Sequence, residues 1–318
     1  MTIHIAFSSD KKYLTCTSVT IASILHFHPH DINFYILHNS LTEADWLPLR
    51  QTIERLGKGC SLMPIDVGDT NWKGFPTTKN FPLAIYFRLN LPSLLTNIDK
   101  VIYLDGDILV TDDIQKVWDI NLEDFSLAAM CIKCLNNNFQ QLVGHYTFNS
   151  GFIVMNLKHI RDTNGITRLL EIANRCKDNF NLPDQEILNL TFRDEKYHLP
   201  VRWNLTKGAL ERQDINYKTI PEEELIEAIR NPAVIHFNNS TKPWKKVAKN
   251  KHPFAPLYLY FAKLARVPLG LRFLLFLKFT LHFVRNIYSP WCLEHLPEIN
   301  KTIRRIRRGR FDPSAPKP

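Results

Sequence analysis

The chain has 318 residues and 45% of them are hydrophobic, which is ordinary for a soluble globular protein and allows one large domain or two modest ones. Its formal charge of +9 is uneven, because residues 245–318 carry 16 basic and three acidic residues, whereas residues 1–244 carry 24 basic and 28 acidic ones. A mildly acidic body with a basic tail argues against a nucleic-acid-binding protein and favours a tail that binds anionic surfaces.

The first part of the chain alternates between short apolar runs and longer amphipathic runs. These runs predict strand, helix, strand, helix and strand, in that order, at residues 3–7, 14–27, 33–37, 42–56 and 61–65. Thr42, followed three residues later by Asp45, predicts the N-cap of the second helix. Short apolar strands separated by helices of this length favour a parallel sheet covered on both faces, so the expected fold class is α/β.

The sheet is expected to resume with a strand at residues 100–104, which runs directly into Asp105-Gly106-Asp107. Further strands are expected at residues 127–132, 152–157 and 233–237, and further helices at residues 166–179 and 184–192. In open α/β sheets, ligands bind outside the carboxyl ends of the strands. A polar site is therefore expected where the strand at residues 100–104 ends.

Asp105 and Asp107 offer two hard oxygen donors at a strand end, and Gly106 between them lets the backbone bend and a ligand come close. This spacing suits Mg²⁺ or Mn²⁺ with phosphate oxygens completing the coordination shell. His236 closes another apolar strand and adds an imidazole nitrogen, which shifts the preference toward Mn²⁺. Taken alone, the two aspartates are also compatible with a solvated turn and His236 with a satisfied core histidine. Lys242, six residues further on, can offer a positive charge to a diphosphate.

Six short motifs occur in an order that resembles glycosyltransferase family 8, the retaining enzymes of GT-A fold that include bacterial lipopolysaccharide galactosyl- and glucosyltransferases and, more distantly, glycogenin. The resemblance covers residues 3–245. The motifs lie at residues 8–13, 86–89, 101–107, 148–151, 184–189 and 236–244. The resemblance implies a GT-A, Rossmann-like fold, with a mixed and mostly parallel sheet flanked by helices.

The resemblance also implies a site for a UDP-sugar, either UDP-glucose or UDP-galactose. The residues that would bind this donor are Ser8, Asp10, Tyr13, Arg88, Asp105, Gly106 and Lys242. Tyr13 and Asp10 would receive the uracil by stacking and hydrogen bonding, and Lys242 would neutralise the leaving UDP. The Mn²⁺ or Mg²⁺ ion would be held by Asp105, Asp107 and His236.

The hexose would be lined by Asn149, Asp184 and Gln185, which are the expected catalytic residues. Asp184 follows Pro183, so it fits the first turn of a helix and its favourable dipole. Because the amide of Gln185 is a poor nucleophile, retention is expected to proceed by attack from the face of the leaving group. The chain departs from the usual family pattern at Asn239, where glycine is usual, and at residues 130–133, which lack an acidic residue expected near the acceptor.

The resulting hypothesis is a metal-dependent, retaining glycosyltransferase that moves glucose or galactose from a UDP-sugar to a lipopolysaccharide, lipooligosaccharide or other surface glycan. An alternative within the family is a glycogenin-like primer that glucosylates itself. Alternatives from other classes are a nucleic-acid-binding protein, suggested by the sequence pI near 9.2, and a non-catalytic homologue. No nucleic-acid partner is expected, because the body is acidic and carries no recognisable nucleic-acid-binding module.

The catalytic domain is expected to span residues 1–245 and a basic, aromatic, helical tail residues 246–318. Residues 273–284 are rich in Leu and Phe and too short for a membrane span, so they suit a helix in a membrane interface or a helix docked on the body. Residues 301–310 concentrate six basic side chains, with Ile303 and Ile306 on one helical side. Six scattered cysteines and no leader-like start predict a cytoplasmic protein. The basic tail predicts that this protein is peripheral on the inner face of the cytoplasmic membrane.

Overall fold

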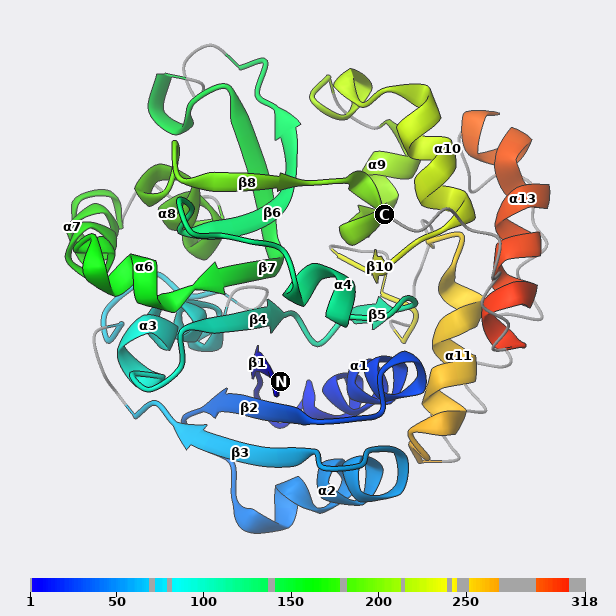
Figure 1. Cartoon of the computed structure of the whole chain (residues 1–318), viewed down its shortest axis with the longest axis horizontal. Helices are drawn as coiled ribbons and strands as arrows, with labels where there is room; N and C mark the ends of the chain where they lie inside the picture. Colours follow the sequence, from blue (N-terminus) through cyan, green and yellow to red (C-terminus); the bar gives the residue numbers. More distant parts are fainter. Residues whose placement is uncertain are drawn as a thin grey trace.

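The computed structural model describes residues 2–68, 72–78, 82–136, 141–177, 182–212, 215–238, 242–244, 252–268 and 290–308. These residues form a seven-stranded sheet and a smaller three-stranded sheet, surrounded by helices (Figure 1). Among the described residues, no helix has both the length and the apolar character needed to cross a membrane.

The large sheet is mixed and mostly parallel. Its strands, in spatial order, are β3 (Ser61–Asp66), β2 (Ile32–His38), β1 (Ile3–Ser8), β4 (Lys100–Leu104), β7 (Tyr146–Asn156), β6 (Leu127–Lys133) and β8 (Lys196–Leu199). β7 runs antiparallel to both of its neighbours, and the other neighbouring pairs are parallel. The α/β fold class predicted from the sequence is therefore confirmed.

Helices cover both faces of this sheet, and the alternation of side chains along β4 shows why. Ile102 and Leu104 point into a cluster that contains residues of α1 (Leu14–Phe27) and α2 (Glu43–Leu56). Val101 and Tyr103 point into a second cluster on the other face. That cluster is built with η1 (Leu83–Asn90), α3 (Leu91–Leu94), α6 (Leu157–Asp162), α7 (Gly165–Cys176) and α8 (Pro183–Thr191).

The elements expected at residues 3–65 are confirmed to within one or two residues. Thr42 caps α2 as predicted, because the Asp45 carboxylate accepts hydrogen bonds from its backbone N–H at 2.9 Å and its hydroxyl at 2.8 Å. The largest difference is at β7, which begins at Tyr146 rather than at residue 152. As a result, Asn149 and Gly151 lie inside a strand and not in a loop before it.

The second sheet brings distant residues together at the end of β4. Its order is β5 (Ile108–Val110), β10 (Val234–His236) and β9 (Leu205–Thr206). β10 is antiparallel to β5, so His236 pairs with Ile108, the residue after Asp107. The shorter connecting elements are α4 (Gln115–Trp118), η2 (Val201–Trp203), α9 (Lys207–Glu211), η3 (Tyr217–Thr219) and α10 (Glu222–Arg230).

The described part of the C-terminal region packs on the body. Helices α11 (Ala255–Leu264) and α13 (Pro290–Arg307) lie at the edge of the molecule next to α1 and α10 (Figure 1). Ile303 and Ile306 are 5% exposed and share one hydrophobic cluster with α10 and α11, so these two side chains are not free to enter a membrane. Asn239 and residues 273–284 lie outside the described residues, and a domain boundary after residue 245 stays a prediction.

Candidate active site

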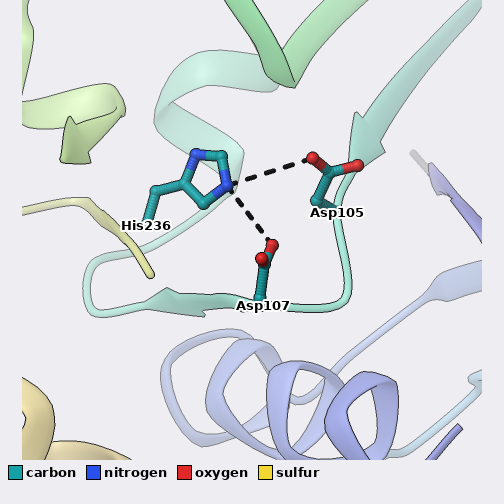
Figure 2. Close-up of side chains that lie close together, drawn as sticks. All are labelled: Asp105, Asp107 and His236. Carbon is teal, nitrogen blue, oxygen red and sulfur yellow. Dashed lines mark ion pairs between the residues drawn. The ribbon is translucent and has the colours of Figure 1, made fainter. Parts of the chain in front are cut away.

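Three predicted metal ligands converge at the junction of the two sheets. Asp105 follows β4, Asp107 precedes β5, and His236 ends β10. His236 Nε2 lies 3.3 Å from Asp107 Oδ1 and 3.9 Å from Asp105 Oδ2 (Figure 2). One ligand atom from each residue lies within 4.8 Å of the others, which is close enough for a single ion to contact all three.

The chemistry of this cluster fits a divalent cation. Asp107 Oδ1 is buried and makes no hydrogen bond within the described part of the chain, so this oxygen lacks a donor. Gly151 lies beside the cluster, where a Cβ atom would sit 2.3 Å from His236 Cε1 and 2.8 Å from Asp105 Oδ2. Two carboxylates and an imidazole are ligands suited to Mn²⁺ or Mg²⁺, and glycine leaves them room.

Lys242 forms an ion pair with Asp107 Oδ2. Burial alone would raise the pKa of Asp107, but the charge of Lys242, with His236 beside the carboxylate, outweighs burial and holds that pKa well below its usual range. The Lys242 ammonium also lies over two aromatic rings, 5.3 Å from the centroid of Tyr13 and 5.9 Å from that of Trp244. Lys242 therefore supplies a fixed positive charge between the aspartate and the expected uracil-stacking residue.

Arg88 lies on η1 in the protein interior and forms an ion pair with Asp105. Its guanidinium donates to Asp105 Oδ1 at 2.8 Å and to the Ser150 carbonyl at 2.9 Å, and it stacks 4.2 Å from the Tyr103 ring centroid. Only 5% of the side chain is exposed. Asp184 Oδ2 also lies 3.2 Å from Arg88 Nη1, so the Arg88 charge lies between two carboxylates of the site. The expected place of Arg88 near the donor diphosphate stays a prediction.

The three residues expected around the hexose lie together on β7 and α8. Asp184 stands in the first turn of α8 after Pro183, as predicted, and accepts a hydrogen bond from Ser150 Oγ at 2.8 Å. Burial raises the pKa of Asp184, although the nearby Arg88 charge opposes this shift. Gln185 accepts a hydrogen bond from Asn149 Nδ2 at 2.9 Å.

The residues expected at the nucleotide lie at the end of β1 and the start of α1. Ser8 ends β1, and Asp10 Oδ1 accepts a hydrogen bond from the Tyr13 backbone N–H at 3.0 Å. Gly106 packs against α1, because a Cβ atom there would lie 2.8 Å from Thr17 Oγ1, and its expected close approach to a ligand stays a prediction. The absence of a side chain at Gly106 thus lets α1 pack closely next to Asp105 and Asp107.

Comparison with known proteins gives the family of this chain. Residues 4–248 match the family model described as glycosyl transferase family 8. The chain belongs to this family. The resemblance inferred from the six sequence motifs is therefore confirmed.

Relatives of this family 8 protein include a putative glycosyltransferase of Haemophilus influenzae, 29% identical over 255 residues, covering 77% of this chain and 74% of the relative. The lipopolysaccharide 1,2-glucosyltransferase of Escherichia coli is 26% identical over 260 residues, again covering 77% and 74%. The galactosyltransferase LgtC, solved with donor and acceptor sugar analogues, is 26% identical with a TM-score of 0.69, covering 86% of this chain and 100% of LgtC. The family 8 protein therefore shares the GT-A fold, as expected.

Sequence reasoning missed several residues that build the site of this family 8 protein. Gly151 was part of a motif but was not singled out, and its close approach to His236 appears only in three dimensions. Tyr103 donates a hydrogen bond to Asp105 Oδ1 at 3.1 Å, yet it looks like any other strand residue in the sequence. Asn204 is fully buried and lies 2.9 Å from His236 Nδ1, although no motif marks it.

Proposed function

We propose that this family 8 glycosyltransferase moves glucose or galactose from UDP-glucose or UDP-galactose to a lipopolysaccharide, lipooligosaccharide or other surface glycan, with retention of configuration and with Mn²⁺ or Mg²⁺. The observation that carries the proposal is the convergence of Asp105, Asp107 and His236 beside Lys242. Relatives named as a lipopolysaccharide glucosyltransferase and a galactosyltransferase support the substrate class.

The polar groups of the site suit departure of a UDP leaving group. A divalent ion held by Asp105, Asp107 and His236 would supply positive charge next to the donor phosphates. The Lys242 ammonium adds a second charge where the leaving group becomes negative, which is the preorganised electrostatics that contributes most to such reactions. With this stabilisation, departure needs no general acid. Tyr13 offers its ring to the uracil next to the same ammonium.

The sugar side of the site would be formed by Asn149, Asp184 and Gln185. Asp184 is held by Ser150 and Arg88, so its carboxylate is a fixed hydrogen-bond acceptor for sugar hydroxyls rather than a mobile nucleophile. Gln185 offers only an amide. We therefore favour attack by the acceptor from the leaving-group face, with a UDP oxygen taking the acceptor proton.

We also propose that the C-terminal region holds the enzyme against the inner face of the cytoplasmic membrane, where a lipid-linked acceptor would be presented. Lys301, Arg304 and Arg307 on α13 and Arg308 directly after it are exposed, whereas Ile303 and Ile306 of the same helix are buried. Each basic residue near an anionic leaflet contributes about 1 kcal/mol, so four of them support reversible binding.

The proposal is tested by hydrolysis of a panel of nucleotide sugars without acceptor, in Mn²⁺, in Mg²⁺ and in EDTA. We expect release of UDP from UDP-glucose or UDP-galactose and none in EDTA. Greater thermal protection by a GDP-sugar than by UDP-sugars would contradict the donor assignment.

Mass spectrometry of the protein after incubation with UDP-glucose separates a self-glucosylating primer, which gains hexose mass, from a transferase that acts on another acceptor. A salt-dependent mobility shift with DNA or RNA would contradict the absence of a nucleic-acid partner.

A further inference from the structure

A chain of side-chain hydrogen bonds connects the expected metal ligand to the expected sugar-binding amide. His236 Nδ1 lies 2.9 Å from Asn204 Oδ1, and Asn204 Nδ2 donates to Asn149 Oδ1 at 3.1 Å. Asn149 Nδ2 in turn donates to Gln185 Oε1 at 2.9 Å. His236 ends β10, Asn204 directly precedes β9, and Asn149 and Gln185 lie on β7 and α8, so this series of hydrogen bonds crosses the junction of the two sheets.

One backbone group determines the direction of every hydrogen bond in this series of side chains. The Gly151 N–H can only donate, and it lies 3.1 Å from Asn149 Oδ1, which identifies that atom as the carbonyl oxygen of the amide. The neighbour of this oxygen on Asn204 must then be the Nδ2 amino group. The remaining Asn204 oxygen therefore faces His236, and His236 Nδ1 must carry the proton that it accepts.

The direction of these hydrogen bonds determines which atoms are left for ligands at His236 and at Gln185. At His236, a proton on Nδ1 leaves the lone pair of the neutral ring on Nε2, which is the nitrogen that faces Asp105 and Asp107 (Figure 2). At Gln185, Oε1 is occupied by Asn149 and lies 3.4 Å from the Ser150 N–H. Gln185 Nε2 makes no hydrogen bond within the part of the chain that the structure describes, so it is the group left to donate to a sugar hydroxyl.

Asn204 is well placed to impose this order. Its side chain is fully buried, and its backbone N–H donates to the Val201 carbonyl at 3.1 Å. The next two residues, Leu205 and Thr206, pair with Ile235 and His236 in a parallel ladder. The Asn204 amide is thus held beside the imidazole by the backbone pairing of the next two residues and by its own burial.

We propose that Asn204 is a positioning residue that selects the metal-binding tautomer of His236 and, through Asn149, orients Gln185 with its amino group toward the donor sugar. The inference rests on the proposed metal-dependent transfer. It assigns two separable effects to one amide, because the oxygen of Asn204 serves the metal ligand and its nitrogen serves the sugar side.

The test compares Asn204→Ala, Asn204→Asp and Asn149→Ala with Asn174→Ala, a matched control on the exposed face of α7. Free Mn²⁺ is counted by electron paramagnetic resonance in the absence of donor, and kcat and KM for UDP-sugar hydrolysis are measured separately. Losing an outer-shell partner of a metal-binding histidine weakens metal affinity about 10- to 100-fold, so we expect that loss in Asn204→Ala. Asn149→Ala should lose kcat, and its loss of Mn²⁺ affinity should be smaller than that of Asn204→Ala, because Asn204 Oδ1 can still accept from His236 Nδ1.

Asn204→Asp separates the two effects, because a carboxylate still accepts from His236 Nδ1 but cannot donate to Asn149. It should bind Mn²⁺ at least as tightly as the wild type and lose kcat like Asn149→Ala, and it decides the question if Asn204→Ala does not fold. Wild-type Mn²⁺ affinity in Asn204→Ala, or equal loss of Mn²⁺ affinity in Asn204→Asp and Asn204→Ala, would overturn the inference alone. Absence of Mn²⁺ binding by the wild-type protein would instead overturn the proposed function, and the inference with it.

Discussion

Arg88 Nη2 donates to Asp105 Oδ1 at 2.8 Å, while the other oxygen of the same carboxylate lies 3.9 Å from His236 Nε2. The two oxygens of Asp105 thus have different tasks. One is held by a buried guanidinium, and the other faces the proposed ion site. A carboxylate held in this way loses little conformational freedom when a cation binds, so metal binding needs little rearrangement at this residue.

Replacing either metal-binding aspartate should abolish donor hydrolysis. Asp105→Asn and Asp107→Asn each remove a negative charge that a cation requires, and we expect Mn²⁺ affinity and kcat/KM to fall by about 100-fold or more. Asp162→Asn is the control, because Asp162 is an exposed aspartate that forms an ion pair with Lys158 on the surface. Hydrolysis near the wild-type rate in either Asp105→Asn or Asp107→Asn would contradict the metal assignment.

Adding one methyl group at Gly151 should block the site. A Cβ atom there would lie 2.3 Å from His236 Cε1, which forces the ring to move, so Gly151→Ala should lose most Mn²⁺ binding and donor hydrolysis. Gly74→Ala is a useful comparison: Gly74 has φ +84 and a Cβ atom would meet nothing within 4 Å. That variant should show backbone strain alone, measured as a lower melting temperature with unchanged Mn²⁺ affinity.

The ion pair between Arg168 and Glu195 should make stability depend on pH. Burial would raise the pKa of Glu195, but hydrogen bonds from Arg168 and Ser126 outweigh it and lower that pKa. The stabilisation is therefore present above the unfolded-state pKa of about 4.3 and is lost as the pH falls through the folded-state pKa. Glu195→Gln should lower the urea midpoint at neutral pH, and the difference from wild type should shrink toward about pH 3.

The matched control for this pH dependence is Glu223→Gln, because Glu223 is exposed on α10. A constant gap between wild type and Glu195→Gln across the same pH range would show that the side chain acts by packing and not by its charge.

Two changes at the C-terminus should separate folding from membrane binding. A chain that ends at residue 268 loses Cys292, Ile299 and the two buried isoleucines of α13, so it should be less stable and bind a hydrophobic dye. Replacing Lys301, Arg304, Arg307 and Arg308 with glutamine leaves those apolar contacts intact. This variant should keep its melting temperature and donor hydrolysis but lose sedimentation with anionic liposomes at low salt.

The control for liposome binding replaces four other exposed basic residues, Lys158, Lys177, Arg193 and Lys218, with glutamine. Equal loss of binding in both variants would indicate a response to net charge, and no loss in the α13 variant would assign this helix a purely structural task.

Features that depend on local periodicity and on the order of motifs could be predicted from the amino-acid sequence. The short apolar runs at β1, β2 and β4 and the helical run of α1 were sufficient to predict the parallel sheet, because each pattern is contained in its own segment of the sequence. The position of Asp105 and Asp107 at a strand end followed from the same periodicity. The order of the six motifs was then sufficient to predict the family, which the match to the family model confirms.

The contacts between side chains at the site could not be predicted in this way, because they join residues that are far apart in the sequence. Asn204 is 32 residues from His236 in the sequence and 55 from Asn149, so no local pattern could associate the three. The antiparallel pairing of β10 with β5 brings His236 to Asp107, and the same folding buries Ile303 against α10 where helical periodicity alone also allowed a membrane-facing side. Local propensity specifies each element, whereas contacts between distant elements depend on how their apolar faces pack, and that packing places the polar groups of the site.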